Sequence, residues 1–273
     1  MRLAVHQFAS TFGDAAGNVR RMVEAVRATE ADLWVFPELA TTGYVFAGRD
    51  ECSGLAEPIP GPSTRTLAEA CGERNARIVV GIAERAGRNV YNSAAYVDAS
   101  GVLAVYRKVH LFDREKDCFD PGPDPFAVHP LGEHRLGIMI CFDWLFPEAA
   151  RSLALLGADL IAHPANLVLP YCQAAMATRS IENGVFTATA NRIGAESRAG
   201  ATLRFTGGSQ IVDPRGRVLA RAGDDEEATL VADADLDLAR DKKITARNDR
   251  LADRRPEAYA WKRPATRNRR PAS

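Results

Sequence analysis

The sequence contains no apolar run approaching the ~18–20 residues that a membrane-spanning helix requires. Its first residues, MRLAVHQF, also lack the long apolar segment of a secretory signal peptide. The five cysteines are an odd number and contain no Cys-x-x-Cys pair, so they suggest neither a disulfide framework nor a zinc ribbon. We therefore expect a cytoplasmic protein in a reducing compartment, without a membrane partner.

The chain also lacks a net charge, since Lys+Arg and Asp+Glu number 35 each. This balance hides an asymmetry, because residues 240–273 contain 12 basic and 4 acidic residues while the rest of the chain is acidic. Such a basic tail could bind nucleic acid or dock on an acidic neighbouring surface. Its arginines are interleaved with Asp249, Asp253 and Glu257, which favours docking or helical pairing. We therefore expect no nucleic-acid partner.

Several motifs that identify common enzyme classes are missing. There is no Gly-x-Gly-x-x-Gly, no phosphate-binding Walker loop, no Gly-x-Ser-x-Gly and no His-Glu-x-x-His. The five histidines lack the spacing of metal ligands, so each is expected to be a structural hydrogen-bonding residue. We therefore expect neither a metal ion nor another cofactor.

The chain is that of an ordinary globular protein, with 273 residues, 46% apolar and 26% charged. Apolar β-rich runs alternate with helical patterns, which is typical of a layered α/β fold. No linker or repeat divides the chain, so we expect one domain over residues 1–273. Strands are expected at 3–8, 33–36, 77–84, 90–98, 102–109, 135–141, 159–163 and 185–191, with a closing antiparallel set at 209–213, 218–222 and 229–235. Helices are expected at 62–75, 147–157, 172–183 and after Asn18, which is expected to cap its helix.

Three chemically reactive side chains follow the ends of expected strands. These are Glu38, Lys108 and Cys141. Strand ends are where reacting groups converge in α/β proteins, and a position before a helix and beside an ammonium would lower the pKa of the thiol. A lone cysteine at the end of an apolar strand is, however, more often a small buried residue. From the residues alone, a structural role for Cys141 is therefore favoured over a catalytic role.

The local sequences around these residues resemble, in order, the three signature blocks of the nitrilase superfamily of carbon–nitrogen hydrolases. The blocks read LWVFPE for residues 33–38, YRKVHLFD for 106–113, and GIMICFD for 137–143 followed by FPE. The resemblance continues through HPAN at 163–166, RSIEN at 179–183 and residues 189–194. It covers the chain from residue 3 to about residue 237.

The resemblance implies a four-layer αββα sandwich with the catalytic site at one end. Cys141 would attack the carbonyl or nitrile carbon, and Glu38 would act as general base and acid. Lys108 and the backbone N–H of Phe142 would stabilise the oxyanion of the tetrahedral intermediate. The superfamily also uses a second glutamate in the loop after the lysine, and Glu115 fits that position, where it would orient Lys108.

Four further residues are candidates for substrate binding: Phe142, Tyr44, Asn166 and Tyr171. Phe142 follows the nucleophile, Tyr44 resembles superfamily residues near the pocket, and the other two follow the strand after the nucleophile helix. Tyr44 could equally be an aromatic that covers the core, and Asn166 could satisfy backbone groups in a turn. Asp143, Arg151 and Glu182 are expected to be structural, and Cys118 and Cys172 to be uninvolved, although Cys118 lies in the active-site loop and could be reactive.

The superfamily cleaves nitriles, primary amides or N-carbamoyl compounds, or transfers acyl groups, and a fold does not choose among them. True nitrilases usually carry Cys-Trp-Glu, whereas Cys141-Phe142-Asp143 resembles the amidases. We therefore expect hydrolysis of a small amide to a carboxylic acid and ammonia through a Cys141 thioester. The CFDW, HPANLV and NDRL stretches are also similar to a small archaeal nitrilase group, so a small aliphatic nitrile is the alternative substrate and an N-carbamoyl compound a further one.

Assembly follows from the same resemblance. The superfamily forms dimers or larger oligomers, in which the helices after the nucleophile meet across a two-fold axis and the C-terminal tails cross to the partner. We therefore expect a homodimer or higher homo-oligomer, with residues 240–273 packing on a partner subunit. A catalytically silent binding protein is an alternative that the intact Glu38, Lys108, Glu115 and Cys141 argue against.

Overall fold

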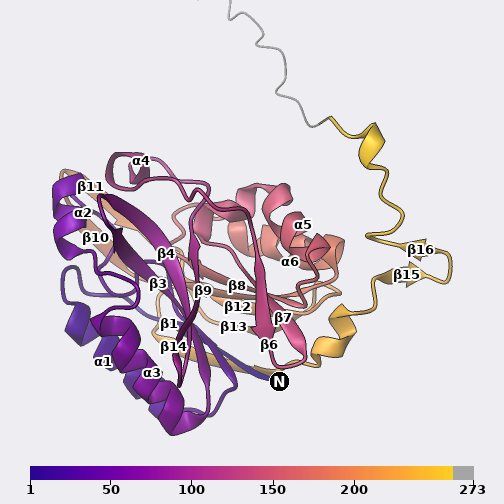
Figure 1. Cartoon of the computed structure of the whole chain (residues 1–273), viewed down its shortest axis with the longest axis horizontal. Helices are drawn as coiled ribbons and strands as arrows, with labels where there is room; N and C mark the ends of the chain where they lie inside the picture. The colour runs from indigo at the N-terminus through magenta and orange to yellow at the C-terminus, as the bar shows by residue number, and fades with distance from the viewer. Residues whose placement is uncertain (261–273) are drawn as a thin grey trace, which may run out of the picture.

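A computed structural model describes residues 1–260, so the last part of the basic tail lies outside the described residues. Two six-stranded sheets pack face to face, and helices cover the outer face of each (Figure 1). The order of layers is helices, sheet, sheet, helices. The expected α/β class and αββα sandwich are thus confirmed.

The first sheet has the strand order β14-β1-β2-β3-β4-β5. Strands β1, β2 and β3 are parallel, and β4 reverses and β5 reverses again, so β2 and β5 end at the same edge. The bounds are β1 (Arg2–Gln7), β2 (Leu33–Val35), β3 (Arg77–Ala86), β4 (Asn89–Asp98), β5 (Gly101–Arg107) and β14 (Ala228–Asp233).

The second sheet has the order β13-β12-β9-β8-β7-β6, and its centre is also a parallel trio, β7, β8 and β9. The bounds are β6 (Val128–Leu131), β7 (His134–Ile138), β8 (Leu160–Ala165), β9 (Phe186–Asn191), β12 (Gln210–Val212) and β13 (Val218–Arg221). The prediction of one closing antiparallel set at 209–213, 218–222 and 229–235 is therefore wrong for the last of these strands. Strand β14 leaves the β12–β13 hairpin and pairs with β1 of the first sheet.

Helices α1 (Ala15–Ala28) and α3 (Pro62–Arg74) cover the first sheet, and α5 (Pro147–Leu155) and α6 (Cys172–Asn183) cover the second (Figure 1). The expected cap of α1 is wrong, because Asp14 caps it by accepting from the Gly17 N–H. Asn18 is buried inside the helix, where its side chain bonds the backbone of Thr11 and Thr41. It ties α1 to the loop that follows Glu38.

Side chains that alternate along the strands of the first sheet contribute to two hydrophobic cores, one on each face of the sheet. Leu3 and Val5 of β1 point into a cluster shared with the second sheet, whereas Ala4 lies in a cluster with residues of α1 and α3. This period of two is the pattern of a strand that is buried on both faces. A polar side chain directly after one of these central strands, such as Glu38 after β2, is therefore buried inside the sandwich.

Several short elements were not expected from the sequence. They are α2 (Arg49–Leu55), α4 (Glu115–Cys118), the hairpin β10 (Ala195–Arg198) with β11 (Ala201–Arg204), the 3₁₀ turns Cys141–Leu145, Leu236–Ala239 and Pro256–Ala258, and the tail hairpin β15 (Lys243–Thr245) with β16 (Asn248–Asp249). α2, α4 and the β10–β11 hairpin gather at one end of the sandwich (Figure 1). No helix within residues 1–260 has the length and apolar character to cross a membrane.

Candidate active site

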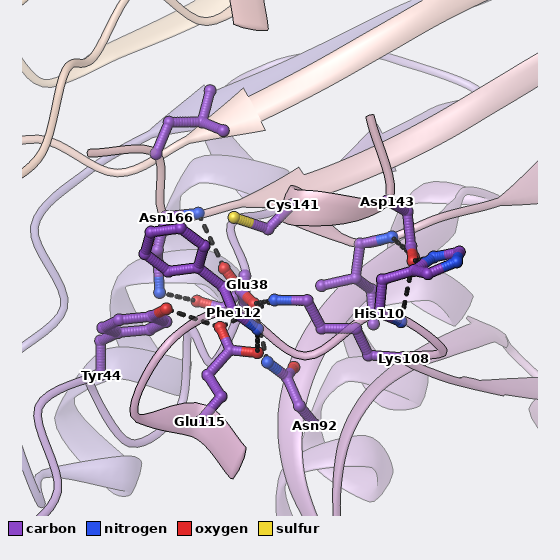
Figure 2. Close-up of polar contacts among 12 residues, drawn as sticks. Glu38, Tyr44, Asn92, Lys108, His110, Phe112, Glu115, Cys141, Asp143 and Asn166 are labelled. Carbon is purple, nitrogen blue, oxygen red and sulfur yellow. Dashed lines mark hydrogen bonds and ion pairs between the residues drawn. The ribbon is translucent and has the colours of Figure 1, made fainter. Parts of the chain in front are cut away.

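The chemically reactive side chains come from the ends of strands in both sheets. Glu38 follows β2, Lys108 follows β5, Cys141 follows β7, and Asn166 follows β8. The two sheets face each other, so these strand ends bring the side chains into one buried cluster (Figure 2). Glu115 reaches the same cluster from α4, in the loop between the sheets.

The backbone around Glu38 requires a glycine on the neighbouring strand. The N–H of Ala40 donates to the Gly81 carbonyl at 2.8 Å, and the N–H of Gly81 donates to the Pro37 carbonyl at 3.1 Å. A Cβ added at Gly81 would lie 2.4 Å from the Cα of Glu38, which is an impossible contact. Leu39 has a φ of 46°, in the left-handed region that few side chains adopt. The close approach of β3 at Gly81 and the turn at Leu39 together point the Glu38 side chain into the site.

Three hydrogen-bond donors hold the Glu38 carboxylate. Oε1 accepts from Lys108 Nζ at 2.6 Å and from Asn92 Nδ2 at 2.7 Å, and Oε2 accepts from the Asn166 N–H at 2.9 Å. The Asn166 side-chain amide also donates to the Glu38 carbonyl at 2.8 Å. Because a carboxylate oxygen has two lone pairs, Oε2 retains room to accept a proton.

Lys108 is completely buried between two carboxylates. Its Nζ donates to Glu38 Oε1 at 2.6 Å and to Glu115 Oε1 at 2.7 Å. Burial by itself lowers the pKa of Lys108, but the attraction of Glu115 and Glu38 outweighs it and raises the pKa above its ordinary value. The site therefore holds a fixed ammonium charge at every physiological pH.

Glu115 is locked in place by partners from three directions. It accepts from Lys108, from the Tyr44 hydroxyl at 2.5 Å and from the Phe112 N–H at 3.1 Å. Burial raises the pKa of Glu115, Lys108 opposes that shift, Glu38 adds to it, and the net pKa is about 7. Glu115 thus titrates near neutrality.

Tyr44 is itself held by a buried ion pair. Its backbone N–H and that of Val45 donate to the carboxylate of Glu196, at 3.3 Å and 2.6 Å. Glu196 pairs with Arg192 at 2.5 Å, and both side chains are almost fully buried. The β10–β11 hairpin thereby connects to Glu115 through Tyr44.

Cys141 begins the 3₁₀ turn after β7 with a φ of 41°. A cysteine in the left-handed region is strained, and such strain is concentrated at functional sites. His163 Nε2 donates to the Cys141 carbonyl at 3.0 Å, and the Thr189 hydroxyl donates to Nδ1 at 3.1 Å. Burial lowers the pKa of His163 to about 4, so the imidazole is neutral and serves to hold the turn.

The expectation of a lowered thiol pKa is wrong. Burial and the negative charge of Glu38 raise the pKa of Cys141 well above its ordinary value, and Lys108 only partly opposes them. Cys141 is therefore a neutral thiol at rest and becomes a nucleophile only if a base removes its proton during the attack. Figure 2 shows the sulfur above the Glu38 carboxylate, and Glu38 is the charged group that acts most strongly on the thiol.

The space beside Cys141 is small and largely apolar. About 10 Å³ is free, and the walls are Phe112, Cys141, Phe142, Trp144, Asn166, Leu167, Val168 and Leu169. A single water needs ~10–15 Å³ measured in this way. None of these wall residues is charged, so the pocket favours a short uncharged group.

The sequence-predicted site residues are not all near this pocket. Phe142 and Asn166 line it, whereas Tyr44 is absent from its wall and bonds Glu115 instead. Tyr171 is 63% exposed at the start of α6 and is absent from the wall. Cys118 is buried and burial raises its pKa, so its thiol is protonated.

Asp143, Arg151 and Glu182, which are expected to be structural, form hydrogen bonds that support the local structure. Asp143 accepts from the Tyr106 hydroxyl at 2.7 Å, from the Ile140 N–H at 2.8 Å and from His110. Arg151 donates to the carbonyl of Glu182 at 2.9 Å. These bonds fix the turn that carries Cys141 and the end of α6.

Sequence reasoning missed Asn92, Phe112 and the Arg192–Glu196 pair. Asn92 stands in a strand whose neighbours are all buried, and a buried amide in such a run signals a specific partner. Phe112 is part of the block that resembles the superfamily, but nothing in its spacing shows that it faces the pocket. Within residues 1–260, no three or more His, Cys, Asp or Glu side chains form a potential metal site.

The fold brings a thiol, carboxylates and an ammonium group together in one buried cluster, an arrangement that suits hydrolysis. The sequence profile of the carbon–nitrogen hydrolase family matches residues 2–244. The chain therefore belongs to the carbon–nitrogen hydrolase family, and the expected membership of the nitrilase superfamily and the expected enzyme class are confirmed.

The chain is similar to relatives that are named for different activities. It is 47% identical to a nitrilase of Pyrococcus abyssi, across 88% of this chain and 90% of the relative. It is 37% identical to an (R)-stereoselective amidase of a Pseudomonas species, across 93% and 92%. A solved structure of a Nesterenkonia amidase variant aligns with a TM-score of 0.77 and 29% identity, across 94% of each chain. That variant carries the acetamide moiety of fluoroacetamide covalently on its active-site cysteine.

Proposed function

We propose that this enzyme hydrolyses small primary amides to carboxylic acids and ammonia, with Cys141 as nucleophile, Glu38 as general base and acid, and Lys108 as oxyanion partner. The observation that carries the proposal is the Lys108 ammonium, held at 2.6 Å from Glu38 and 2.7 Å from Glu115 beside a neutral thiol. This arrangement supplies a nucleophile, a base and a fixed positive charge without a cofactor.

The acylation half-reaction follows from these groups. The sulfur of Cys141 bonds to the carbonyl carbon as its proton passes to Glu38. The negative charge that develops on the substrate oxygen is stabilised by Lys108 and the Phe142 N–H. Glu38 then gives the proton to the nitrogen, the carbon–nitrogen bond breaks, and ammonia leaves a thioester on Cys141.

Deacylation reuses the same residues in reverse. Glu38 takes a proton from water as the water oxygen bonds to the thioester carbon, and Lys108 again neutralises the oxyanion. The carbon–sulfur bond breaks, and the proton returns from Glu38 to the Cys141 sulfur. Glu115 keeps Lys108 in place through both halves, because its carboxylate is the second partner of Nζ.

An amide is favoured over a nitrile by an acceptor in the pocket wall. Asn166 is 1% exposed, lines the pocket, and its Oδ1 has no hydrogen-bond partner among the described residues. The N–H groups of a primary amide could donate to this oxygen, whereas a nitrile has no hydrogen to donate. The 47% identity to the Pyrococcus nitrilase supports a small aliphatic nitrile as the second candidate substrate.

The test is ammonia release from matched pairs of amides and nitriles with the same carbon skeleton. We expect wild type to release ammonia from the amides, and Cys141→Ala to release none. Lys108→Met is expected to lower kcat by roughly 10²–10³-fold, the usual loss for one oxyanion partner. Turnover of nitriles but not amides would establish the second candidate, and undiminished turnover by Cys141→Ala would refute the mechanism.

We also propose that residues 1–273 form one catalytic domain, with 240–273 as its tail, and that the chain is a homodimer or higher homo-oligomer in the cytoplasm. All five cysteines are free, which fits a reducing compartment. Large apolar side chains on and near α5 and α6 are exposed, among them Leu155, Leu156 and Ile181. Exposed apolar surface of this kind is typical of an interface between subunits.

A further inference from the structure

We propose that Phe112 sets the upper limit on the length of the acyl group, because its side chain separates the pocket at Cys141 from a second apolar pocket. The proposal rests on the proposed function. Phe112 is the residue that lines both spaces, the one of about 10 Å³ beside Cys141 and another of about 100 Å³. Figure 2 shows its ring in the middle of the cluster, among Asn166, Tyr44 and Glu115.

The second pocket has the chemistry of an alkyl-binding site. Besides Phe112, five of its wall residues have apolar side chains without a hydrogen-bonding group: Val45, Phe46, Phe119, Ala201 and Leu203. The polar groups of Tyr44 and Glu115 that border it already bond each other at 2.5 Å. The charged Asp113 and Arg114 are exposed at its rim. An alkyl chain entering this space would leave water without separating any polar pair.

The backbone of Phe112 takes part in the catalytic cluster, whereas its side chain forms the wall between the two pockets. The Phe112 N–H donates to Glu115 Oε2 at 3.1 Å, so the backbone belongs to the catalytic cluster. Its ring packs edge-to-face on Phe142, with 5.0 Å between ring centroids, and is half-buried. Shortening the side chain therefore removes the wall and leaves the backbone hydrogen bond to Glu115 intact.

The experiment compares wild type, Phe112→Leu and Phe112→Ala on linear primary amides from acetamide to octanamide. We expect kcat/KM of wild type to fall as the chain lengthens. Phe112→Ala is expected to raise the ratio of hexanamide to acetamide kcat/KM by at least about tenfold, and Phe112→Leu by less, since one methylene in an apolar pocket changes kcat/KM by ~10–200-fold. Phe126→Leu is the matched control, because Phe126 stacks on Tyr106 and lines neither pocket. An unchanged chain-length profile in an active Phe112→Ala would overturn the proposal.

A second measurement does not require amide turnover. Linear aldehydes add reversibly to a thiol, forming a sulfur–carbon bond while the thiol proton moves to the aldehyde oxygen. Protection of Cys141 from iodoacetamide, followed by peptide mass, reports the binding of each aldehyde. We expect long aldehydes to protect Phe112→Ala at concentrations at least about tenfold lower than wild type. If no amide is hydrolysed, the proposed function is wrong, but this measurement still tests the role of Phe112. Equal protection of wild type and Phe112→Ala by long aldehydes would refute that role.

Discussion

At the scale of single residues, the site is governed by buried charges that compensate one another. Lys108 would be expensive to bury alone, but Glu38 and Glu115 lie within 2.7 Å of its Nζ. Burial raises the pKa of Glu115, and repulsion by Glu38 adds to that effect, so Glu115 binds a proton more readily than an ordinary glutamate. The ionic state of the whole cluster therefore changes near neutral pH.

The first prediction concerns the pH dependence of kcat/KM. A carboxyl group with a raised pKa is ionised above that pKa and protonated below it, and only the ionised form is a full partner for Lys108. We expect kcat/KM to fall as the pH drops below about 7, with an apparent pKa that belongs to the cluster. Glu115→Gln is expected to move this acid limb and to lower kcat by about 10²-fold through misplacement of Lys108. An unmoved limb in a folded Glu115→Gln would assign the titration to another group.

At the scale of elements, the position of each reactive side chain depends on the backbone turn that follows its strand. Glu38 is turned by Leu39 in the left-handed region and by the approach of β3 at Gly81. Cys141 is turned by its own positive φ and held by His163. The strands supply rigid positions, and the residues just after them supply the chemistry.

The second prediction tests the approach of β3 to Glu38. Gly81→Ala would place a Cβ 2.4 Å from the Cα of Glu38, so one backbone must move. We expect kcat to fall by about 10²-fold, the usual cost of a misplacement near 1 Å. Gly54→Ala is the matched control, because a Cβ there meets nothing within 4 Å. Steady-state kinetics with circular dichroism on both variants checks this, and full activity of a folded Gly81→Ala would contradict it.

At the scale of the whole molecule, the tail leaves the sandwich after crossing one end of its own α6. Lys242 donates to the Gly184 carbonyl at 2.8 Å, and Arg250 donates to the Ile181 carbonyl at 2.9 Å. Apart from the contact of Arg250, residues 243–260 lie outside the four layers, in yellow in Figure 1. Ile244 is 66% exposed there. An extended segment with exposed apolar and basic side chains suits a surface on another subunit.

The third prediction follows from this arrangement. Deleting residues 242–273 should weaken the proposed dimer, because it removes the segment expected to pack on the partner. Light scattering over a dilution series, with the full chain measured in parallel, gives the monomer fraction of each protein. We expect the truncated chain to dissociate at higher protein concentration than the full chain. A truncated chain that stays dimeric to the same dilution would contradict the role of the tail.

The sequence by itself determined the layered α/β class, most strand and helix positions, and the quartet Glu38, Lys108, Glu115 and Cys141 as candidates. Apolar periodicity is a local feature and predicts the elements, and the quartet follows from the resemblance of the local sequences to the nitrilase superfamily. Only the tertiary structure decided which distant groups meet. Asn92 and Asn166 bond Glu38 across 54 and 128 residues of chain. The direction of the Cys141 pKa shift was decided in the same way, since burial and neighbouring charge arise only when the two sheets pack together.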